Sequence, residues 1–378
     1  MSDKKNSQPL VLVSGYYGFG NLGDEAILEE LTNELKKLVS PSQIIVLSND
    51  PEQTKKSFGV ESLNRWKPLD LLSLLPRTAL FISGGGGLFQ DATGIKSTVF
   101  YGCQILLAKF LGSKIYIYAQ GVGPLRSGAA QALARISLSQ ATFTTVRDKD
   151  SHNLLSKWAI DSALTADPVW CLEQTAVPEA AQEQINSLKA RPGLTVGLSL
   201  RTAANFNDQQ LQSLFSTMDQ ELPPQTGLIL LPLQNNQDLE PLTKFAALWR
   251  QKGRSVEFLQ TEGIERPSQW LAILSQLDLL VGMRLHALIM ALKSGIPVVG
   301  IAYDPKVRHV LTQFGQPILN LTKDSDGSNE LAEWLPTMHS AILTLDELST
   351  RAREEAESAK KLACQNFEIL ARILVHAK

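Results

Sequence analysis

The chain has 378 residues, of which 44% are hydrophobic and 20% charged, a composition typical of a globular protein with room for two domains. The net charge of −2 excludes a global basic field for nucleic acid, so any anion site must be local. Its three cysteines, Cys103, Cys171 and Cys364, lie far apart in the sequence and form no CxxC pair, which argues against a disulfide framework or a zinc site. The polar start MSDKKNSQP does not resemble a signal peptide, and no apolar run approaches ~18 residues, so we expect a cytoplasmic protein.

The first half of the chain predicts a parallel sheet. Leu10–Ser14 is a short apolar run typical of a buried strand, and Asp24–Val39 has helical periodicity. A buried helix is expected over Ser97–Leu111, interrupted by Gly102, Gln104 and Lys109. Further strand candidates recur, mostly separated by helical stretches, at Ile44–Leu47, Ala79–Ser83, Lys114–Ala119, Thr142–Val146 and Ala163–Ala166. This alternation predicts an α/β, doubly wound parallel sheet.

Three glycine-rich loops follow strands of this half: GYYGFGNLGDE from Gly15, SGGGGLFQD from Ser83, and AQGVGP from Ala119. Glycine lets the backbone approach a ligand closely, and the carboxyl ends of parallel strands open into one crevice. Polar side chains in the first loop favour contacts such as sugar hydroxyls. We therefore expect the loops to bind a substrate, with the candidate residues Gly18, Asn21, Gly85 and Gly86.

The first of these loops also contains a GxGxxG pattern, formed by Gly18, Gly20 and Gly23, and Asp50 ends the next strand. This mimics a dinucleotide-binding fingerprint. The loop is several residues longer than that fingerprint, however, so the pattern is weak evidence for a nicotinamide enzyme. A glycine-rich turn without any ligand is a further reading.

The second half begins after a polar, proline-bounded stretch, Glu173–Pro192, which predicts a linker and a peripheral helix. A second α/β series follows, with strand candidates at Thr195–Leu200, Gly227–Leu231, Ser255–Phe258, Leu277–Val281, Val298–Ile301 and Pro317–Leu321. The first of these ends next to Arg201. We expect domains over residues 1–175 and 190–344, with their parallel sheets facing a central cleft, and a helical tail over residues 345–378.

Basic residues follow two neighbouring strands of the second half. In GMRLHALIMALKSGIPVVGIAYDPK, a helix links the two strands, and a right-handed crossover places both strand exits on one edge. A single Arg or Lys is usually a solvated cap, and a lone His is usually structural. Several together favour a site for a small anion, with His as a proton donor that titrates near neutral pH. The candidates are Arg284, His286, Lys306 and Arg308.

Six stretches then point to a known family, in order along nearly the whole chain: GYYGFGNLGDEAIL, SGGGGLFQD, TTVRDKDS, ADPVW, GMRLHAL and GIPVVGIAYDPK. Together they resemble the polysaccharide pyruvyl transferase family, closest to its CsaB type. The resemblance implies two Rossmann-like domains of GT-B architecture. It also implies transfer of the enolpyruvyl part of phosphoenolpyruvate to a sugar of a cell-surface polysaccharide precursor, with formation of a pyruvate ketal and release of phosphate.

The resemblance also implies roles for individual residues. The family's contacts to phosphoenolpyruvate match Arg147, His286 and Lys306, and Arg284 lies in the same RLH motif. His286 is then expected to protonate the methylene carbon. A carboxylate of the first domain is expected to accept the hydroxyl proton, with Asp24 and Asp91 as candidates.

Phosphoenolpyruvate is expected as the donor substrate, with no cofactor and no metal. The expected partner is a saccharide, lipid-linked in many family members, which would bring the protein to the cytoplasmic membrane face; no nucleic acid is expected. Two alternatives stay open, a GT-B glycosyltransferase that uses a nucleotide sugar and a non-catalytic glycan- or anion-binding module. The acceptor sugar and the oligomeric state are not readable from the sequence.

Overall fold

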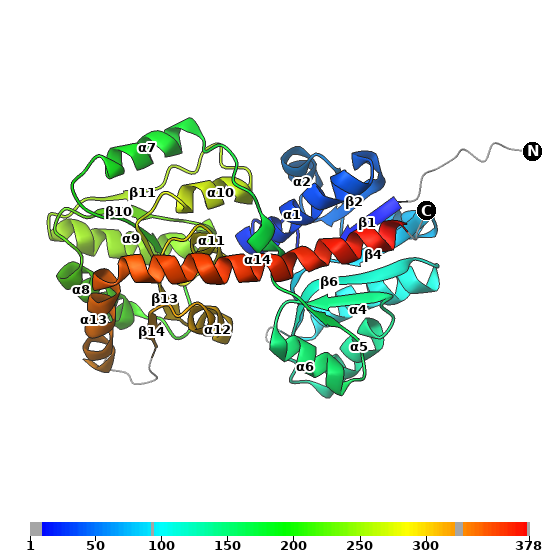
Figure 1. Cartoon of the computed structure of the whole chain (residues 1–378). Coiled ribbons are helices and arrows are strands. Elements are labelled where there is room, and N and C mark those ends of the chain that lie inside the picture. The colour runs from blue at the N-terminus through cyan, green and yellow to red at the C-terminus, as the bar shows by residue number, and fades with distance from the viewer. Residues whose placement is uncertain (1–9, 92–93, 322–327, 376–378) are drawn as a thin grey trace, which may run out of the picture. The chain divides into compact units, whose positions relative to one another are not determined.

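The computed structural model describes residues 10–91, 94–321 and 328–375, and the chain divides into two compact units. Unit 1 comprises Met1–Leu172 with Ala359–Lys378, and unit 2 comprises Glu173–Ser358. The last helix, α14 (Leu345–Val375), contributes residues to both units (Figure 1). None of the helices in the described parts of the chain is long and apolar enough to cross a lipid bilayer.

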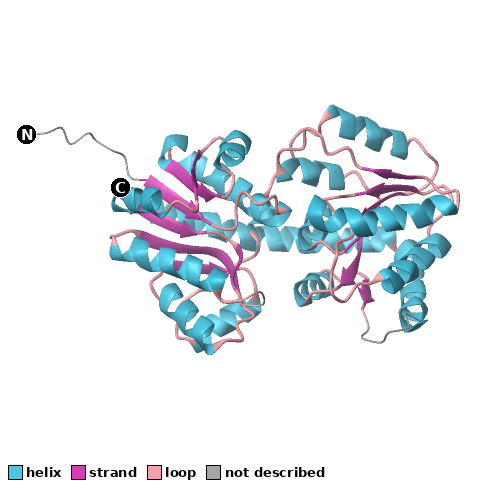
Figure 2. Ribbon diagram, turned by 180° about the vertical axis from the view of Figure 1, so that it is seen from behind, coloured by secondary structure: helices cyan, strands magenta, loops and turns pink. Residues whose placement is uncertain are grey.

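Unit 1 is built on a parallel eight-stranded sheet in the order β3-β2-β1-β4-β6-β7-β8, with β5 paired to β6. Helices flank the strands of each unit (Figure 2). The strands of unit 1 are β1 (Leu10–Ser14), β2 (Ile44–Ser48), β3 (Glu61–Asn64), β4 (Thr78–Ser83), β5 (Gly86–Phe89), β6 (Lys114–Val122), β7 (Phe143–Val146) and β8 (Ala163–Leu164). Its helices are α1 (Leu22–Leu38), α2 (Pro51–Phe58), α3 (Pro68–Leu74), α4 (Lys96–Phe110), α5 (Gly128–Leu138) and α6 (Lys149–Lys157), with 3₁₀ turns η1 (Pro41–Gln43), η2 (Leu75–Arg77) and η3 (Pro168–Cys171).

The two faces of this sheet are covered by different helices, because successive side chains of a strand point to opposite faces. On β6, Ile115 joins an apolar core with residues of α4 and α5. The neighbouring Tyr116 faces α14 instead, and its hydroxyl donates to the carbonyl oxygen of Asn366 at 3.0 Å. Tyr118 repeats this pattern, with its ring centroid 6.1 Å from that of Phe367. The end of the chain thus completes the core of unit 1.

Unit 2 is built on a parallel six-stranded sheet in the order β11-β10-β9-β12-β13-β14. Its strands are β9 (Thr195–Ser199), β10 (Gly227–Leu230), β11 (Val256–Phe258), β12 (Leu279–Gly282), β13 (Val298–Ala302) and β14 (Ile318–Asn320). Its other helices are α7 (Glu179–Lys189), α8 (Asp208–Glu221), α9 (Asn235–Gln251), α10 (Pro267–Leu274), α11 (Leu285–Lys293), α12 (Pro305–Gln313) and α13 (Ser328–Leu343). Both sheets have the Rossmann-like doubly wound order that the sequence predicts.

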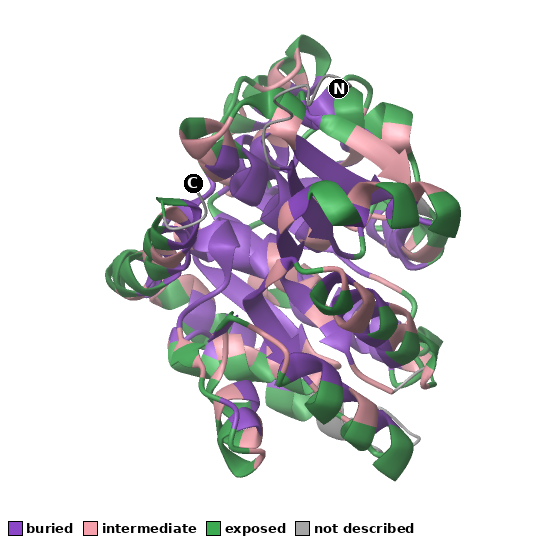
Figure 3. Cartoon of the chain, turned by 90° about the vertical axis from the view of Figure 1, so that its right-hand side faces the viewer, coloured by how far each residue is buried: buried purple, intermediate pink, exposed green. Residues whose placement is uncertain are grey.

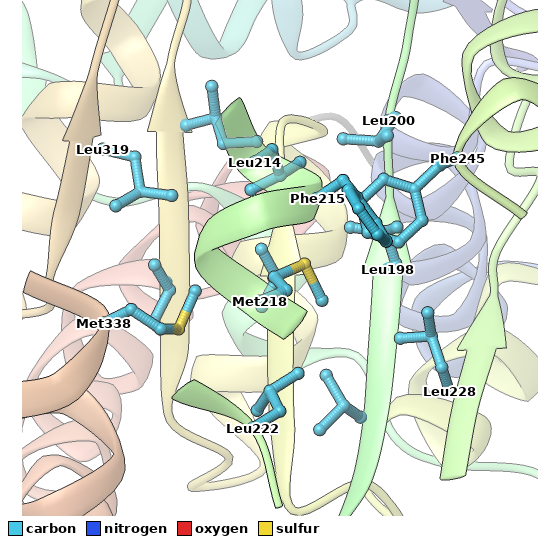
Figure 4. Packing of buried hydrophobic residues seen from close by; sticks show 14 of the residues in the cluster. Leu198, Leu200, Leu214, Phe215, Met218, Leu222, Leu228, Phe245, Leu319 and Met338 are labelled. Carbon is cyan, nitrogen blue, oxygen red and sulfur yellow. The ribbon is translucent and has the colours of Figure 1, made fainter. Parts of the chain in front are cut away.

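The core of unit 2 packs α8 against the sheet. Leu214, Phe215 and Met218 of α8 lie over Leu198 and Leu228 of the central strands (Figure 4). All five side chains are at most 5% exposed. Figure 3 shows the same layering in both units, with buried strands beneath helices whose outer faces are exposed. A rigid core of this kind fixes the strand ends, from which the functional loops leave.

Two strands lie where the sequence analysis expected none. β3 has a polar sequence, ESLN, and its residues are exposed or half-buried, so its pattern carries no hydrophobic signal. β5 occupies part of the second glycine-rich loop, and β6 extends through most of the third, to Val122. The prediction that both stretches are open loops was therefore wrong, because their backbones pair with each other as strands.

Helix α4 also differs from its prediction. It is exposed on one side, where Phe110 is 85% exposed, so it is not buried all round. Gly102 and Gln104, which we expected to interrupt an apolar helix, instead lie on its buried side. The Gln104 side-chain oxygen accepts a hydrogen bond from the Ser14 hydroxyl at 2.5 Å. These two residues serve the packing of the helix against α5 and β1.

Two of the three cysteines, distant in the sequence, are neighbours in the fold. Cys171 and Cys364 lie in unit 1 and form no disulfide, with their Sγ atoms 3.1 Å apart. The separation of cysteines along the chain was therefore a poor guide to their separation in space.

Candidate functional site

The strand orders single out one edge of each sheet. In unit 1 the order reverses between β1 and β4, and in unit 2 between β9 and β12. Ligands of doubly wound sheets bind outside the carboxyl ends of the strands at such a reversal. We call the residues that follow these strand ends the carboxyl edge of unit 1 and the carboxyl edge of unit 2.

The carboxyl edge of unit 2 is basic. Arg201 follows β9, Arg284 follows β12, and Lys306 lies shortly after β13. Strand β12 pairs directly with both β9 and β13, so the three side chains leave adjacent strands about 4.8 Å apart. Arg308, the fourth predicted cation, is exposed on α12. The edge therefore gathers three basic residues beyond the ends of three adjacent strands.

Arg284 is positioned by a buried carboxylate. Its Nε and Nη2 atoms donate to Oδ1 of Asp238 on α9 at 3.1 and 2.5 Å, and Nη2 also donates to the side-chain oxygen of Gln237 at 3.3 Å. The Asp238 side chain is completely buried, and that of Arg284 is 13% exposed. Burial raises the pKa of Asp238, and the Arg284 guanidinium offsets part of that rise. The pair fixes the direction of the guanidinium and neutralises part of its charge.

Arg201 is positioned by an aromatic ring. Its guanidinium carbon lies 5.3 Å from the ring centroid of Tyr303, and Nη1 donates to the Tyr303 hydroxyl at 3.3 Å. The Asn205 side-chain amide in turn donates to the backbone oxygen of Tyr303 at 3.2 Å. Arg201 was not among the predicted site residues. The available signal was its place directly beyond a predicted central strand.

His286 is the second residue of α11 and is half-buried. The N-cap of this helix is Arg284, whose side chain makes no capping hydrogen bond. The next helix differs, because Asp304 caps α12 and accepts from the backbone N–H of Lys306 at 2.8 Å. An uncapped helix N-terminus presents N–H groups and the positive end of the helix dipole. His286 therefore lies where an anion is favoured.

The first loop of the carboxyl edge of unit 1 wraps around a carboxylate of the protein itself. The backbone N–H of Gly18 donates to Oε1 of Glu25 at 2.7 Å, and the N–H groups of Phe19 and Gly20 also bond this carboxylate. Burial raises the pKa of Glu25 to about 7, although these hydrogen bonds oppose the rise. The side-chain oxygen of Asn21 caps α1 by accepting from Gly23 at 3.0 Å. Gly18 and Asn21, two predicted substrate contacts, thus shape the loop and start the helix.

The second glycine run makes room for neighbouring side chains. A Cβ atom at Gly85 would lie 2.9 Å from Cγ2 of Ile27, and one at Gly86 would lie 2.6 Å from Oδ1 of Asp24. Gly86 also has a φ of +104°, which favours glycine. The predicted residues Gly85, Gly86 and Asp24 therefore come together at this edge, where α1 begins.

Two other predicted residues of unit 1 have internal partners. The Asp91 carboxylate accepts from the backbone N–H groups of Arg126 and Ser127 at 2.8 and 2.6 Å, and these bonds lower its pKa. Nη1 of Arg147 pairs with Oδ2 of Asp167 at 2.5 Å, with both side chains at most 10% exposed. Asp91 thus ties a turn to the end of β5, and the charge of Arg147 is balanced within unit 1.

No group of three or more His, Cys, Asp or Glu side chains is arranged to hold a metal ion in the described stretches 10–91, 94–321 and 328–375. Comparison with known families adds an assignment for most of the chain. Residues 21–305 match the model of the family described as polysaccharide pyruvyl transferase. This range includes every predicted site residue except Gly18, Lys306 and Arg308.

Solved structures with a similar fold are nucleotide-sugar enzymes and a synthase. HepE from Anabaena, solved with UDP and glucose, is 14% identical and aligns with a TM-score of 0.64 over 98% of this chain and 100% of its own. UDP-GlcNAc 2-epimerase from Neisseria meningitidis is 13% identical, with a TM-score of 0.62 over 98% and 100%. Sucrose-phosphate synthase from Thermosynechococcus elongatus is 16% identical, with a TM-score of 0.60 over 98% and 100%. At these identities the likeness shows the fold alone, and that fold is the two-domain, Rossmann-like GT-B fold.

Proposed function

This chain belongs to the polysaccharide pyruvyl transferase family, and from that premise we propose that it moves the enolpyruvyl group of phosphoenolpyruvate onto a sugar of a cell-surface polysaccharide precursor, forming a pyruvate ketal and releasing phosphate. The basic carboxyl edge of unit 2 is the observation that carries this proposal. Phosphoenolpyruvate holds a carboxylate and a phosphate close together, and Arg201, Arg284 and Lys306 offer cations for both. The uncapped start of α11 adds backbone N–H donors.

His286 is proposed as the general acid. It gives a proton to C3, the methylene carbon, so that positive charge develops at C2. A sugar hydroxyl attacks C2, and the bond between C2 and the phosphate oxygen breaks with its electron pair leaving on phosphate. A second hydroxyl of the same sugar then adds to C2 and closes the ketal. The two hydroxyls supply two protons. One of them replaces the proton that His286 gave to C3, and the other leaves with phosphate.

Asp24 is the better candidate for the group that accepts the first hydroxyl proton. The Asp91 carboxylate is engaged by two backbone N–H groups that lower its pKa, which makes it a weaker base. Asp24 lies beside Gly86 at the carboxyl edge of unit 1, where we propose that the saccharide binds. For Arg147, contact with phosphoenolpyruvate stays a prediction from the family resemblance, and its guanidinium is paired with Asp167.

The proposal is tested by phosphate release from phosphoenolpyruvate in the presence of lipid- or aryl-linked sugars. His286→Ala should lower the rate by roughly 10²–10⁴-fold, the usual contribution of general acid catalysis. His309→Ala is the matched control, because this histidine is exposed on α12 and should leave the rate unchanged. Near-normal turnover by His286→Ala would remove this residue from the mechanism.

A GT-B glycosyltransferase is the second candidate, because similar solved structures were determined with UDP or a UDP-sugar. The same basic edge would then hold a diphosphate. Thermal unfolding separates the two functions. Phosphoenolpyruvate should raise the unfolding temperature if the protein is a pyruvyl transferase, whereas stabilisation by UDP- or GDP-sugars alone would favour the glycosyltransferase.

A further inference from the structure

A group of aromatic rings lies beside the carboxyl edge of unit 1 and has no role in the site described above. Tyr16 and Phe19 belong to the loop after β1, Trp66 follows β3, and Phe100 lies on α4. We call these four residues the aromatic cluster. The rings of Tyr16 and Phe19 stack with centroids 4.1 Å apart, and those of Trp66 and Phe100 lie 5.4 Å apart. Tyr16 is 40% exposed and Trp66 is 58% exposed, so the cluster reaches the surface.

A buried cation holds the cluster together. The guanidinium carbon of Arg65 lies 5.1 Å from the ring centroid of Phe19, 5.2 Å from that of Trp66 and 4.5 Å from that of Phe100. Arg65 is only 7% exposed. It donates from Nη1 to the carbonyl oxygen of Gly15 at 2.8 Å and from Nη2 to the Tyr101 hydroxyl at 3.0 Å. These hydrogen bonds and cation–π contacts fix the guanidinium, and through it the rings.

The orientation of the exposed ring is also fixed. Nε1 of Trp66 donates to the side-chain oxygen of Asn49 at 2.9 Å, and the Asn49 amide donates to the carbonyl oxygen of Gly18 at 3.3 Å. The backbone N–H of Trp66 donates to the Asn64 side chain at 2.8 Å. A large apolar ring that is held rigidly yet left exposed is informative, because burial would be favourable. It provides contact area without an entropic cost of ordering on binding.

From this geometry we propose that the aromatic cluster is a saccharide subsite, in which a sugar ring of the acceptor stacks on the exposed faces of Trp66 and Tyr16. The inference rests on the proposed function in taking the acceptor to be a saccharide. A sugar ring presents C–H bonds to the electron-rich face of an aromatic ring and hydroxyls at its rim. Burial is the main cause of the raised pKa of Tyr16 and of Tyr101, and the carboxylate of Asp24 adds to both rises. A carboxylate therefore lies near the cluster to accept from such hydroxyls.

The nearby charges favour a neutral ring over other aromatic-stacking ligands. A nucleotide would bring phosphates towards the carboxylate of Asp24, and an anionic lipid surface would do the same. Arg65 does not present its charge outwards as a surface lysine would, because its side chain is buried among the rings and donates to two neutral oxygens. A hydroxyl-rich, uncharged ring brings no phosphate towards Asp24 and needs no outward-facing cation.

Binding is tested without catalysis, by saturation-transfer NMR with methyl glycosides of hexoses and N-acetylhexosamines, which carry no aromatic group. One face of a sugar ring should receive saturation from the wild-type protein, and Trp66→Ala should weaken the affinity roughly tenfold, as truncation of an aromatic hot spot does. Trp66→Phe should retain most of the affinity. Phe110→Ala is the matched control, because Phe110 is an exposed aromatic residue at the far end of α4. Glycosides that bind equally well to Trp66→Ala, or a uridine nucleotide that depends on Trp66 in their place, would overturn the inference.

Kinetics then separate this inference from the proposed function. If both hold, Trp66→Ala raises the KM for the acceptor roughly tenfold and leaves the KM for phosphoenolpyruvate unchanged. Trp66-dependent glycoside binding without any pyruvyl transfer would support the subsite and contradict the proposed function. Pyruvyl transfer with an unchanged acceptor KM in Trp66→Ala would contradict the subsite and leave the function standing. The unfolding temperature of each variant checks its fold.

Discussion

The two units share a sheet design and differ in the chemistry of their carboxyl edges. In unit 2 the side chains that leave three adjacent central strands are basic: Arg201, Arg284 and Lys306. In unit 1 the corresponding loops carry carboxylates and aromatic rings, and two of the arginines near them, Arg65 and Arg147, are held by internal partners. A parallel sheet determines only where loops meet, so the residues of the loops decide what binds. One edge suits an anion, and the other suits a neutral ring with hydroxyls.

The edges also show that glycine can serve different purposes. In unit 1 the glycines of the second loop leave space for Tyr17, Ile27 and Asp24, and those of the first loop turn around Glu25. In unit 2, Gly282 ends β12 and its Cβ position would lie 3.3 Å from Ser199 of the neighbouring strand. Glycines at the end of a strand therefore indicate close packing. They indicate a ligand only when other groups nearby also do so.

The largest effect is expected when the basic edge loses its buried carboxylate. Asp238→Ala leaves Arg284 without its partner in a nearly buried position. Removal of one member of a buried ion pair costs about 3–5 kcal/mol, and we expect that loss in the free energy of unfolding measured with urea. Asp208→Ala, which breaks an exposed pair with Lys244, should cost less than about 1 kcal/mol. Equal effects of the two changes would contradict a special role for Asp238.

The buried carboxylate of Glu25 in unit 1 should make the free energy of unfolding depend on pH. The pKa of Glu25 is about 7 in the folded protein, compared with an ordinary value of 4.5. The folded state therefore binds this proton more tightly than the unfolded state does. The stabilisation from this proton is fully present below about pH 4.5 and is lost as the pH rises through about 7. It amounts to at most about 3 kcal/mol of the free energy of unfolding. Glu25→Gln should remove this component from a pH series of denaturation curves. Exposed Glu240→Gln is the control, and parallel curves for wild type and Glu25→Gln would refute the assignment.

Arg201 should contribute to the binding of phosphoenolpyruvate at the basic edge of unit 2. Loss of a charge-assisted hydrogen bond costs about 1.5–3 kcal/mol, so Arg201→Ala should weaken phosphoenolpyruvate binding roughly 10–100-fold in calorimetry. Arg254→Ala is a matched control, because Arg254 also packs over an aromatic ring, 4.7 Å from the Trp249 centroid, but lies just before β11. That variant should lose stability and keep its affinity. Equal affinity in Arg201→Ala and wild type would remove Arg201 from the site.

The smallest expected effect concerns the space beside Asp24. Gly86→Ala places a Cβ 2.6 Å from Oδ1 of Asp24 at a φ of +104°. Gly94→Ala introduces the same kind of strain, at +106°, into open space. The difference between the two variants isolates crowding at Asp24, which we expect to cost about 1 kcal/mol of stability. The acceptor KM should rise in Gly86→Ala only, and a matching rise in Gly94→Ala would show that strain alone is responsible.

The architecture was predictable because buried parallel strands leave a strong pattern. Runs such as Leu10–Ser14 and Val298–Ile301 are apolar on both faces, and the structure places strands there. The edge strand Glu61–Asn64 lacks that pattern because it is largely solvated. Gly86–Phe89 was missed because glycines that pack against side chains look the same in sequence as glycines of an open loop.

The candidate site was predictable where its residues are close in sequence, and less so elsewhere. Arg284, His286 and Lys306 lie within one βαβ unit, so strand geometry alone places them on one edge. The partners of Arg284 and Arg65 come from distant segments, and no local pattern links Asp238 to β12 or Phe100 to Trp66. Such pairings follow from helix packing, which depends on the whole core.

Pyruvyl transfer is tested most directly by the mass of a saccharide acceptor after incubation with the protein and phosphoenolpyruvate. We expect a mass increase equal to pyruvic acid less one water, with one phosphate released for each acceptor modified. The proposed mechanism also predicts that His286→Ala forms both products roughly 10²–10⁴-fold more slowly, whereas His309→Ala forms them at the wild-type rate. An acceptor that phosphoenolpyruvate leaves unchanged, and to which a nucleotide sugar adds a hexose, would contradict it.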